Sequence, residues 1–153
     1  MSGGYEIVVW FILIAASVTD LLWGKIYNHL TLTFIVGGVI VRLFLEGFPS
    51  ASNAIYSIGT AFILFFPLYY LKVLAAGDVK LLMAIGAWAN SEWVIRISLT
   101  SIVIGAVVGA FIMIRKKLSS QEPKTLTRMP FGPAFLCSLL FLKIAEFKGW
   151  VIF

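Results

Sequence analysis

Apolar residues fill this chain in six long blocks, separated by short segments in which charged, Gly, Pro or Asn residues accumulate. The blocks lie near residues 5–23, 29–46, 53–73, 77–91, 93–114 and 131–150. An α-helix needs roughly 20 such residues to cross the hydrocarbon layer of a bilayer. The pattern predicts an all-α, polytopic membrane protein with about six transmembrane helices, in which residues 1–153 form a single domain.

The composition agrees with this prediction. Of the 153 residues, 61% are hydrophobic and only 12% are charged, and the mean hydropathy is +1.01. About a quarter of an ordinary soluble sequence is charged. The first block is not typical of a signal peptide, which normally opens with Lys or Arg, because the only charged side chain before the stretch from Ile7 to Ala16 is Glu6. We therefore expect a first transmembrane helix that is retained.

The distribution of Lys and Arg predicts the orientation. Eight basic residues follow the first, third and fifth helices: Lys25, Lys72, Lys80, Arg115, Lys116, Lys117, Lys124 and Arg128. Four lie on the opposite side: Arg42, Arg96, Lys143 and Lys148. Cytosolic connections carry the excess of positive charge, so we expect both termini outside the cytosol, in a cytoplasmic (inner) membrane. Anionic lipid headgroups suit the long connection near 115–130, and the net charge of +5 is explained without nucleic acid.

Metal and cofactor chemistry have little support in the sequence. Cys137 is the only cysteine and His29 the only histidine, so the chain has no internal disulfide and no CxxC pair for zinc. No glycine-rich phosphate loop is present. We expect no metal and no cofactor, and we interpret His29 as an interfacial polar residue.

Asp20 and Asp78 are the only two aspartates in the chain. They lie at the end of the first predicted helix and the start of the fourth, both on the predicted cytosolic side. Ionisable residues within membrane helices are expensive and usually functional. Glu6 precedes Asp20 by 14 residues and Glu92 follows Asp78 by 14, a helical rise of about 21 Å against a hydrocarbon thickness of about 30 Å. If both glutamates mark the outer interface, both aspartates lie slightly beneath the cytosolic surface.

Two carboxylates at one depth suggest peptide hydrolysis. When such groups approach closely they share one proton, so that one activates water while the other polarises a carbonyl group. Structural roles are the alternatives from the residues alone. Asp78 suits an N-cap of the fourth helix, and Asp20 suits a place among the headgroups or a pair with Lys25.

Three segments resemble type IV prepilin peptidases. Asp20-Leu-Leu-Trp-Gly-Lys-Ile-Tyr-Asn28, followed by Leu30-Thr31, resembles the first active-site region of that family. Ala75-Ala-Gly-Asp78-Val-Lys80-Leu-Leu resembles its GxGD motif with a following Lys, and Met129-Pro-Phe-Gly-Pro133 resembles the opening of its last helix. Order, spacing and the six-helix plan agree over nearly the whole chain.

The resemblance implies roles for particular residues. It makes Asp20 and Asp78 the catalytic pair and gives supporting roles to Gly77, where backbone passes close to substrate, and to Lys80, which could tune the pair. The implied substrate-binding residues are Lys25, Asn28, Pro130, Gly132 and Pro133. Two positions depart from the family pattern, Ala75 in place of Gly and Tyr27 in place of Pro. Ala75 is harmless if the position need only be small, but strained if it requires a positive φ.

The implied activity is that of an intramembrane aspartyl endopeptidase. Its substrate would be a type IV, Flp-like prepilin, cut after a short basic leader at the cytosolic membrane face in pilus assembly and protein secretion. Longer members also carry a cysteine-rich domain and methylate the new N-terminus; nothing in this sequence corresponds to that domain, so the chain resembles the short, peptidase-only form of tight-adherence pili. Partners would be the prepilin and the bilayer, with no prediction for the oligomeric state.

Two other functions remain open from the sequence. The chain could be a small proton-coupled transporter or channel that uses Asp20 and Asp78 as a relay, although we find no internal repeat of the kind common in transporters. It could also be a non-catalytic subunit of pilus or secretion assembly, in which the aspartates are helix caps. Conservative Asp→Asn changes separate the peptidase from the assembly subunit, because the peptidase should lose activity while still folding and the assembly subunit should tolerate the change.

The predicted topology can be tested with reporter fusions. A reporter inserted within 116–128 should read as cytosolic and one near 47–52 as external, because Lys and Arg are concentrated on the first side. The measurement is the activity of a paired cytosolic and external reporter at each site. The opposite pattern would place both aspartates on the wrong face for a prepilin leader.

Overall fold

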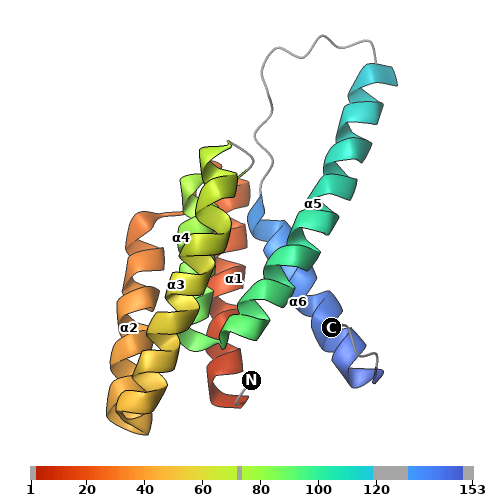
Figure 1. Cartoon of the computed structure of the whole chain (residues 1–153). Helices are drawn as coiled ribbons and strands as arrows, with labels where there is room; N and C mark the ends of the chain where they lie inside the picture. Colours follow the sequence, from red (N-terminus) through yellow and green to blue (C-terminus); the bar gives the residue numbers. More distant parts are fainter. Residues whose placement is uncertain (1–2, 72–73, 119–130, 150–153) are drawn as a thin grey trace.

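The computed structural model of the chain describes residues 3–71, 74–118 and 131–149. These residues form six α-helices and no strand: α1 (Gly3–Trp23), α2 (Asn28–Glu46), α3 (Phe48–Tyr70), α4 (Ala76–Trp88), α5 (Ser91–Leu118) and α6 (Phe131–Phe147). Successive helices run in opposite directions (Figure 1). The predicted all-α fold is confirmed.

Four of the helices, α1, α2, α3 and α5, are long and apolar enough to cross a membrane. The protein is therefore a multi-pass membrane protein. The other two are shorter, with 13 residues in α4 and 17 in α6. At 1.5 Å per residue α4 is about 20 Å long, less than the roughly 30 Å hydrocarbon layer. The fourth helix is thus as short as its apolar block suggests.

The start of α3 differs from the prediction. The helix begins at Phe48 rather than at residue 53, so only Gly47 separates it from α2. Gly47 has φ +82°, a left-handed conformation that turns the chain within one residue. Pro49 in the first helical turn needs no N–H donor there. Residues 48–52, which separate the second and third apolar blocks, therefore belong to the first turns of the helix.

The end of α5 also differs from the prediction. This helix continues to Leu118 rather than ending at residue 114, so residues 115–117 are helical and not part of a connection. Arg and Lys are good helix formers, which explains why the helix continues through them. The rest of the long basic connection, 119–130, lies outside the described residues.

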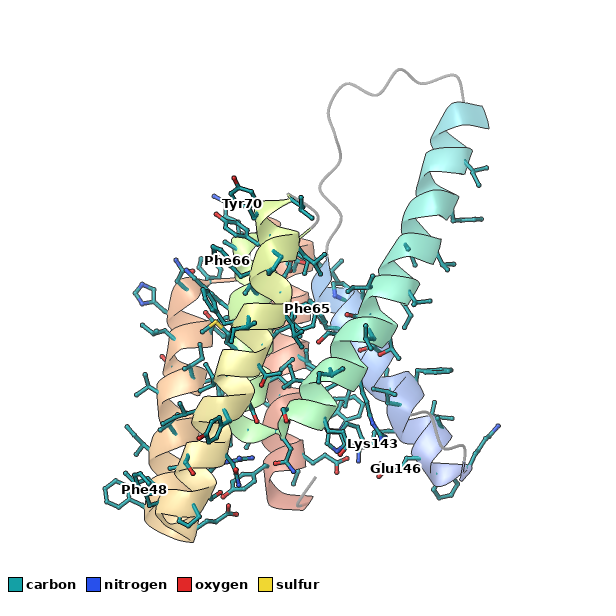
Figure 2. The ribbon with its side chains drawn as sticks, in the orientation of Figure 1. Phe48, Phe65, Phe66, Tyr70, Lys143 and Glu146 are labelled. Atoms are coloured by element: carbon teal, nitrogen blue, oxygen red, sulfur yellow. The ribbon has the colours of Figure 1, made fainter. Side chains whose placement is uncertain are left out.

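The short helix α4 forms the centre of the bundle. It packs against α2 and α3 and also contacts α1 and α5, whereas α6 packs against α1 and α5. Nine of its 13 residues are buried. The outer helices bury only one face: on α3, Phe65 is 4% exposed while Phe66 is 43% exposed and points away from the bundle (Figure 2). Such outward apolar side chains suit contact with lipid.

Two glycines allow α4 to approach its neighbours closely. A Cβ added to Gly38 of α2 would lie 2.7 Å from the Ala87 Cβ, and one added to Gly86 would lie 2.9 Å from the Ser57 carbonyl oxygen on α3. Both distances are too short for real contacts. Close approach through small residues is a common way to pack helices in lipid, where burial of apolar surface from water contributes little.

We predict that Gly86→Ala lowers the thermal unfolding midpoint of the detergent-solubilised protein by about 3–8 °C, because the backbones of α3 and α4 must separate. Gly59→Ala on α3 is the matched control, since a Cβ there meets nothing within 4 Å. Its midpoint should stay level or rise, because Ala is the better helix former. An unchanged midpoint for Gly86→Ala would show that the contact is not tight.

Candidate active site

The segments that carry the three motifs meet at one end of the bundle. The end of α1 and the starts of α2, α4 and α6 all lie there (Figure 1). Asp20 is in the last turn of α1, and Asp78 is in the first turn of α4. The antiparallel order of the helices thus brings together residues that are distant in sequence.

Asp78 is buried, with 4% of its surface exposed. The N-cap of α4 is Ala75, three residues before Asp78. The alternative in which Asp78 is itself the N-cap is therefore wrong. Its carboxylate instead reaches back: Oδ2 accepts a hydrogen bond of 2.8 Å from the Ala75 backbone N–H. The carboxylate of a capping box makes the same contact. The helix start therefore sets the direction of this carboxylate.

Asp20 is half-buried and joins α1 to α6. Its Oδ2 accepts a hydrogen bond of 2.8 Å from the backbone N–H of Gly132, 112 residues away. Gly132 is the second residue of α6, so its N–H has no acceptor within its own helix. Among the described residues no ion pair joins Asp20 to Lys25, which is exposed. Asp20 is thus held by backbone rather than by the nearby cation.

Gly77 and Lys80 connect the second motif to the first. A Cβ added to Gly77 would lie 3.2 Å from the Cβ of Ile26, in the connection between α1 and α2. The Lys80 Nζ donates a hydrogen bond of 2.9 Å to Asn28 Oδ1, at the start of α2. Residues two apart on a helix do not face each other, so Lys80 points away from Asp78. Gly77 therefore has a structural role in close packing, and Lys80 has one in a hydrogen bond between helices. Their predicted roles toward substrate stay predictions.

The remaining predicted residues belong to the start of α6 and its surroundings. Gly132 is buried and Pro133 half-buried in the first turn of that helix, whereas Pro130 lies outside the described residues. Substrate binding by any of them stays a prediction. No three His, Cys, Asp or Glu side chains come together to hold a metal ion in the part of the chain that the structure describes. The metal-free mechanism likewise stays a prediction.

The two departures from the family pattern have ordinary backbone conformations. Ala75 has φ −82° and ψ 157°, so the strained alternative with a positive φ is wrong. Tyr27, the N-cap of α2, has φ −72° and ψ 132°. A proline ring holds φ near −65°, so Tyr27 adopts the conformation that proline would impose. The helix start does not need the ring.

Ser17 is a neighbour of the site that the sequence patterns do not single out. It lies one turn before Asp20 on the same face of α1, is 4% exposed, and its Oγ has no hydrogen-bond partner among the described residues. A Cβ on Gly132 would lie 3.1 Å from the Ser17 Cα. The available signal was the i, i+3 spacing from Asp20 in a mostly apolar helix.

The sequence pattern of the type IV leader peptidase family matches residues 7–110, more than half of the chain and inclusive of both aspartates. The chain belongs to the type IV leader peptidase family. The start of α6 lies beyond the matched segment. No solved structure matches the chain.

Relatives in this family are named prepilin leader peptidase/N-methyltransferase. The protein of Xanthomonas campestris pv. campestris is 31% identical over 99% of this chain and 50% of its own length. That of Aeromonas hydrophila is 29% identical over 92% of this chain and 46% of its own. That of Burkholderia pseudomallei is 32% identical over 79% of this chain and 40% of its own length. The chain therefore spans about half the length of the relatives that it matches.

Ala75 provides a test of the GxGD-like segment. Ala75→Gly should leave prepilin cleavage within about threefold, because φ is already unstrained and Gly is an acceptable N-cap. Ala75→Leu should lower it by more than about tenfold, since the half-buried position beside Asp78 must accommodate a larger side chain. The measurement is the cleavage rate of a synthetic prepilin in purified membranes. Full activity of Ala75→Leu would mean that position 75 faces lipid and does not adjoin the site.

Proposed function

We propose that this chain is an intramembrane aspartyl endopeptidase that removes the short basic leader from type IV, Flp-like prepilins at the cytosolic membrane face. Asp20 and Asp78 are its catalytic pair. One observation carries the proposal: the only two aspartates of the chain lie at the same end of the bundle, and each Oδ2 accepts a backbone N–H at the start of a short helix. Membership of the type IV leader peptidase family supports it.

The two carboxylates are suited to hydrolysis because backbone groups orient them. A backbone donor at a helix start cannot rotate away as a side chain can, so little reorganisation is needed during the reaction. Asp78 is buried and Asp20 half-buried, so both are largely shielded from bulk water. Charges and dipoles act more strongly in such surroundings.

The reaction uses one proton shared by the pair. The ionised carboxylate takes a proton from water as the water oxygen bonds to the scissile carbonyl carbon, and the protonated carboxyl gives its proton to the carbonyl oxygen. The resulting gem-diol then collapses. The first carboxyl protonates the leaving nitrogen, the C–N bond breaks, and a diol hydroxyl returns its proton to the second carboxylate. The pair again holds one proton, and the products are a carboxyl terminus and a free amine.

The place of the site suits a prepilin. Such a substrate has a basic leader directly before a hydrophobic helix, so its scissile bond lies at the boundary between headgroups and hydrocarbon. The excess of basic residues predicts that the end of the bundle carrying the aspartates faces the cytosol. Because α4 is only about 20 Å long, its start can lie beneath that surface while its end reaches the opposite side.

The rival functions make different use of the same contacts. Asp78 accepts the N–H of its own helix start, which is also the contact expected of a structural cap in an assembly subunit. A proton relay would need both aspartates to titrate but would cut no peptide. An informative variant must therefore keep the hydrogen bond and remove the titrating group.

We predict that Asp20→Asn and Asp78→Asn each lower prepilin cleavage at least about 10³-fold, the scale of general acid–base catalysis. The Asn side-chain oxygen can still accept the Gly132 or Ala75 N–H, so both variants should reach parental levels in the membrane. The measurement is cleavage of a full-length prepilin, with protein levels followed in parallel.

Glu92→Gln is the matched control. Glu92 pairs with Arg96 in the first turn of α5, at the opposite end of the bundle, so the loss of its charge should leave cleavage at the parental rate. Parental cleavage by either Asp→Asn variant would refute the catalytic pair and favour an assembly subunit. Proton-coupled transport without cleavage by the parent protein would favour the relay.

A further inference from the structure

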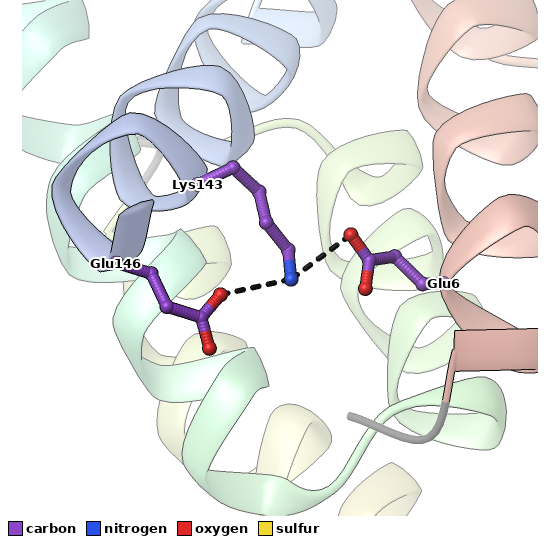
Figure 3. A network of polar contacts seen from close by, with 3 residues as sticks. All are labelled: Glu6, Lys143 and Glu146. Carbon is purple, nitrogen blue, oxygen red and sulfur yellow. Dashed lines mark hydrogen bonds and ion pairs between the residues drawn. The ribbon is translucent and has the colours of Figure 1, made fainter. Parts of the chain in front are cut away.

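Besides their apolar packing, α6 and α1 are joined by two polar contacts among the described residues. One is the hydrogen bond from Gly132 to Asp20 within the site. The other lies toward the opposite end, where Lys143 of α6 meets Glu6 in the first turn of α1 (Figure 3). The two helices are antiparallel, so the second contact lies near the end of α6 and the beginning of α1. Two contacts on one rigid helix fix its rotation as well as its position.

The distant contact is an ion pair with low exposure. The Lys143 Nζ lies 2.9 Å from Glu6 Oε1, and the two side chains are 22% and 25% exposed. The same Nζ lies 2.9 Å from Glu146 Oε2 within α6 and 4.8 Å from the centre of the Trp93 ring on α5. Of these three Lys143 contacts, the ion pair with Glu6 is the one that reaches α1. Partial burial protects such a pair from solvent screening.

The contact in the site depends on the absence of a side chain. A Cβ added to Gly132 would lie 3.0 Å from the Asp20 Cβ, 3.1 Å from Asp20 Oδ2 and 3.1 Å from the Ser17 Cα. Two of these three atoms belong to the backbone or its first carbon, so they cannot move aside by a side-chain rotation. A side chain at position 132 would therefore force α1 and α6 apart by a few tenths of an ångström and lengthen the contact between the Gly132 N–H and the carboxylate.

We propose that Gly132 is a positioning residue for Asp20, and that the Lys143–Glu6 ion pair holds α6 on α1 so that the Gly132 N–H stays on the carboxylate. The proposal rests on the proposed function. It gives Gly132 a different role from substrate binding, because its only backbone donor is already used by Asp20. The first turn of α6 becomes the third part of the site, beside the end of α1 and the start of α4.

Steady-state kinetics on the full chain in lipid vesicles test the proposal, with a synthetic prepilin as substrate. Gly132→Ala should lower kcat at least about tenfold and leave KM within about twofold, because orientation of a catalytic group affects the transition state more than binding. Gly59→Ala should match the parent. Glu6→Gln should lower kcat several-fold, whereas Glu146→Gln, which removes only the partner within α6, should not. Lys143→Arg should keep the activity that Lys143→Met loses.

Hydrogen exchange at the Gly132 amide provides a readout that needs no cleavage. Amides in the first turn of a helix have no acceptor within it and usually exchange fast. The Gly132 amide should exchange slowly in the parent protein and at least about tenfold faster in Asp20→Ala, since an opening free energy of 1.4 kcal/mol corresponds to a factor of ten. It should also exchange faster in Glu6→Gln, but not in Glu146→Gln.

The outcomes separate this proposal from the proposed function. Parental kcat in Gly132→Ala, or equal exchange in Glu6→Gln and Glu146→Gln, would overturn the positioning role and leave the peptidase intact. A parent protein that does not cleave prepilin would overturn the proposed function. The exchange measurement would then still decide whether the ion pair holds the first turn of α6 on Asp20.

Discussion

Free N–H groups at the starts of two short helices are the constraint on which this structure depends. In a bilayer no water is present to satisfy them, and each unsatisfied group costs several kcal/mol. Asp78 satisfies a donor at the start of α4, and Asp20 satisfies one at the start of α6. The same hydrogen bonds hold the two carboxylates in place. Stability and the proposed chemistry therefore use the same atoms.

The opposite end of α4 is also held by a polar contact. Arg42 of α2 is 4% exposed, and one of its terminal nitrogens donates a hydrogen bond of 2.7 Å to the carbonyl oxygen of Trp88, the last residue of α4. A cation suits the negative end of a helix dipole. The guanidinium also lies 5.1 Å from the ring centre of Tyr5 on α1. With Asp78 at its start and Arg42 at its end, the central helix is fixed along its axis, and with it the depth of Asp78.

The candidate site combines residues inside the segment that matches the family with a backbone donor outside it. The family match ends at residue 110, within α5, and the curated relatives extend to about twice the length of this chain. Both aspartates lie within the matched segment, but the donor to Asp20 comes from α6, beyond it. The contact from α6 to Asp20 is made by a backbone N–H. To make it, α6 needs only a helix start with a glycine at this position.

The sequence by itself determined the six helices, the all-α fold and the two aspartates, because apolar blocks and rare charges in hydrocarbon are local signals. It placed the start of α3 five residues late, since a single left-handed glycine and a proline in the first turn replaced the expected loop. Only the tertiary structure decided the partners of Asp20 and Lys80. Gly132 and Asn28 lie 112 and 52 residues away, and the packing of helices, not any local pattern, brings such donors and acceptors together.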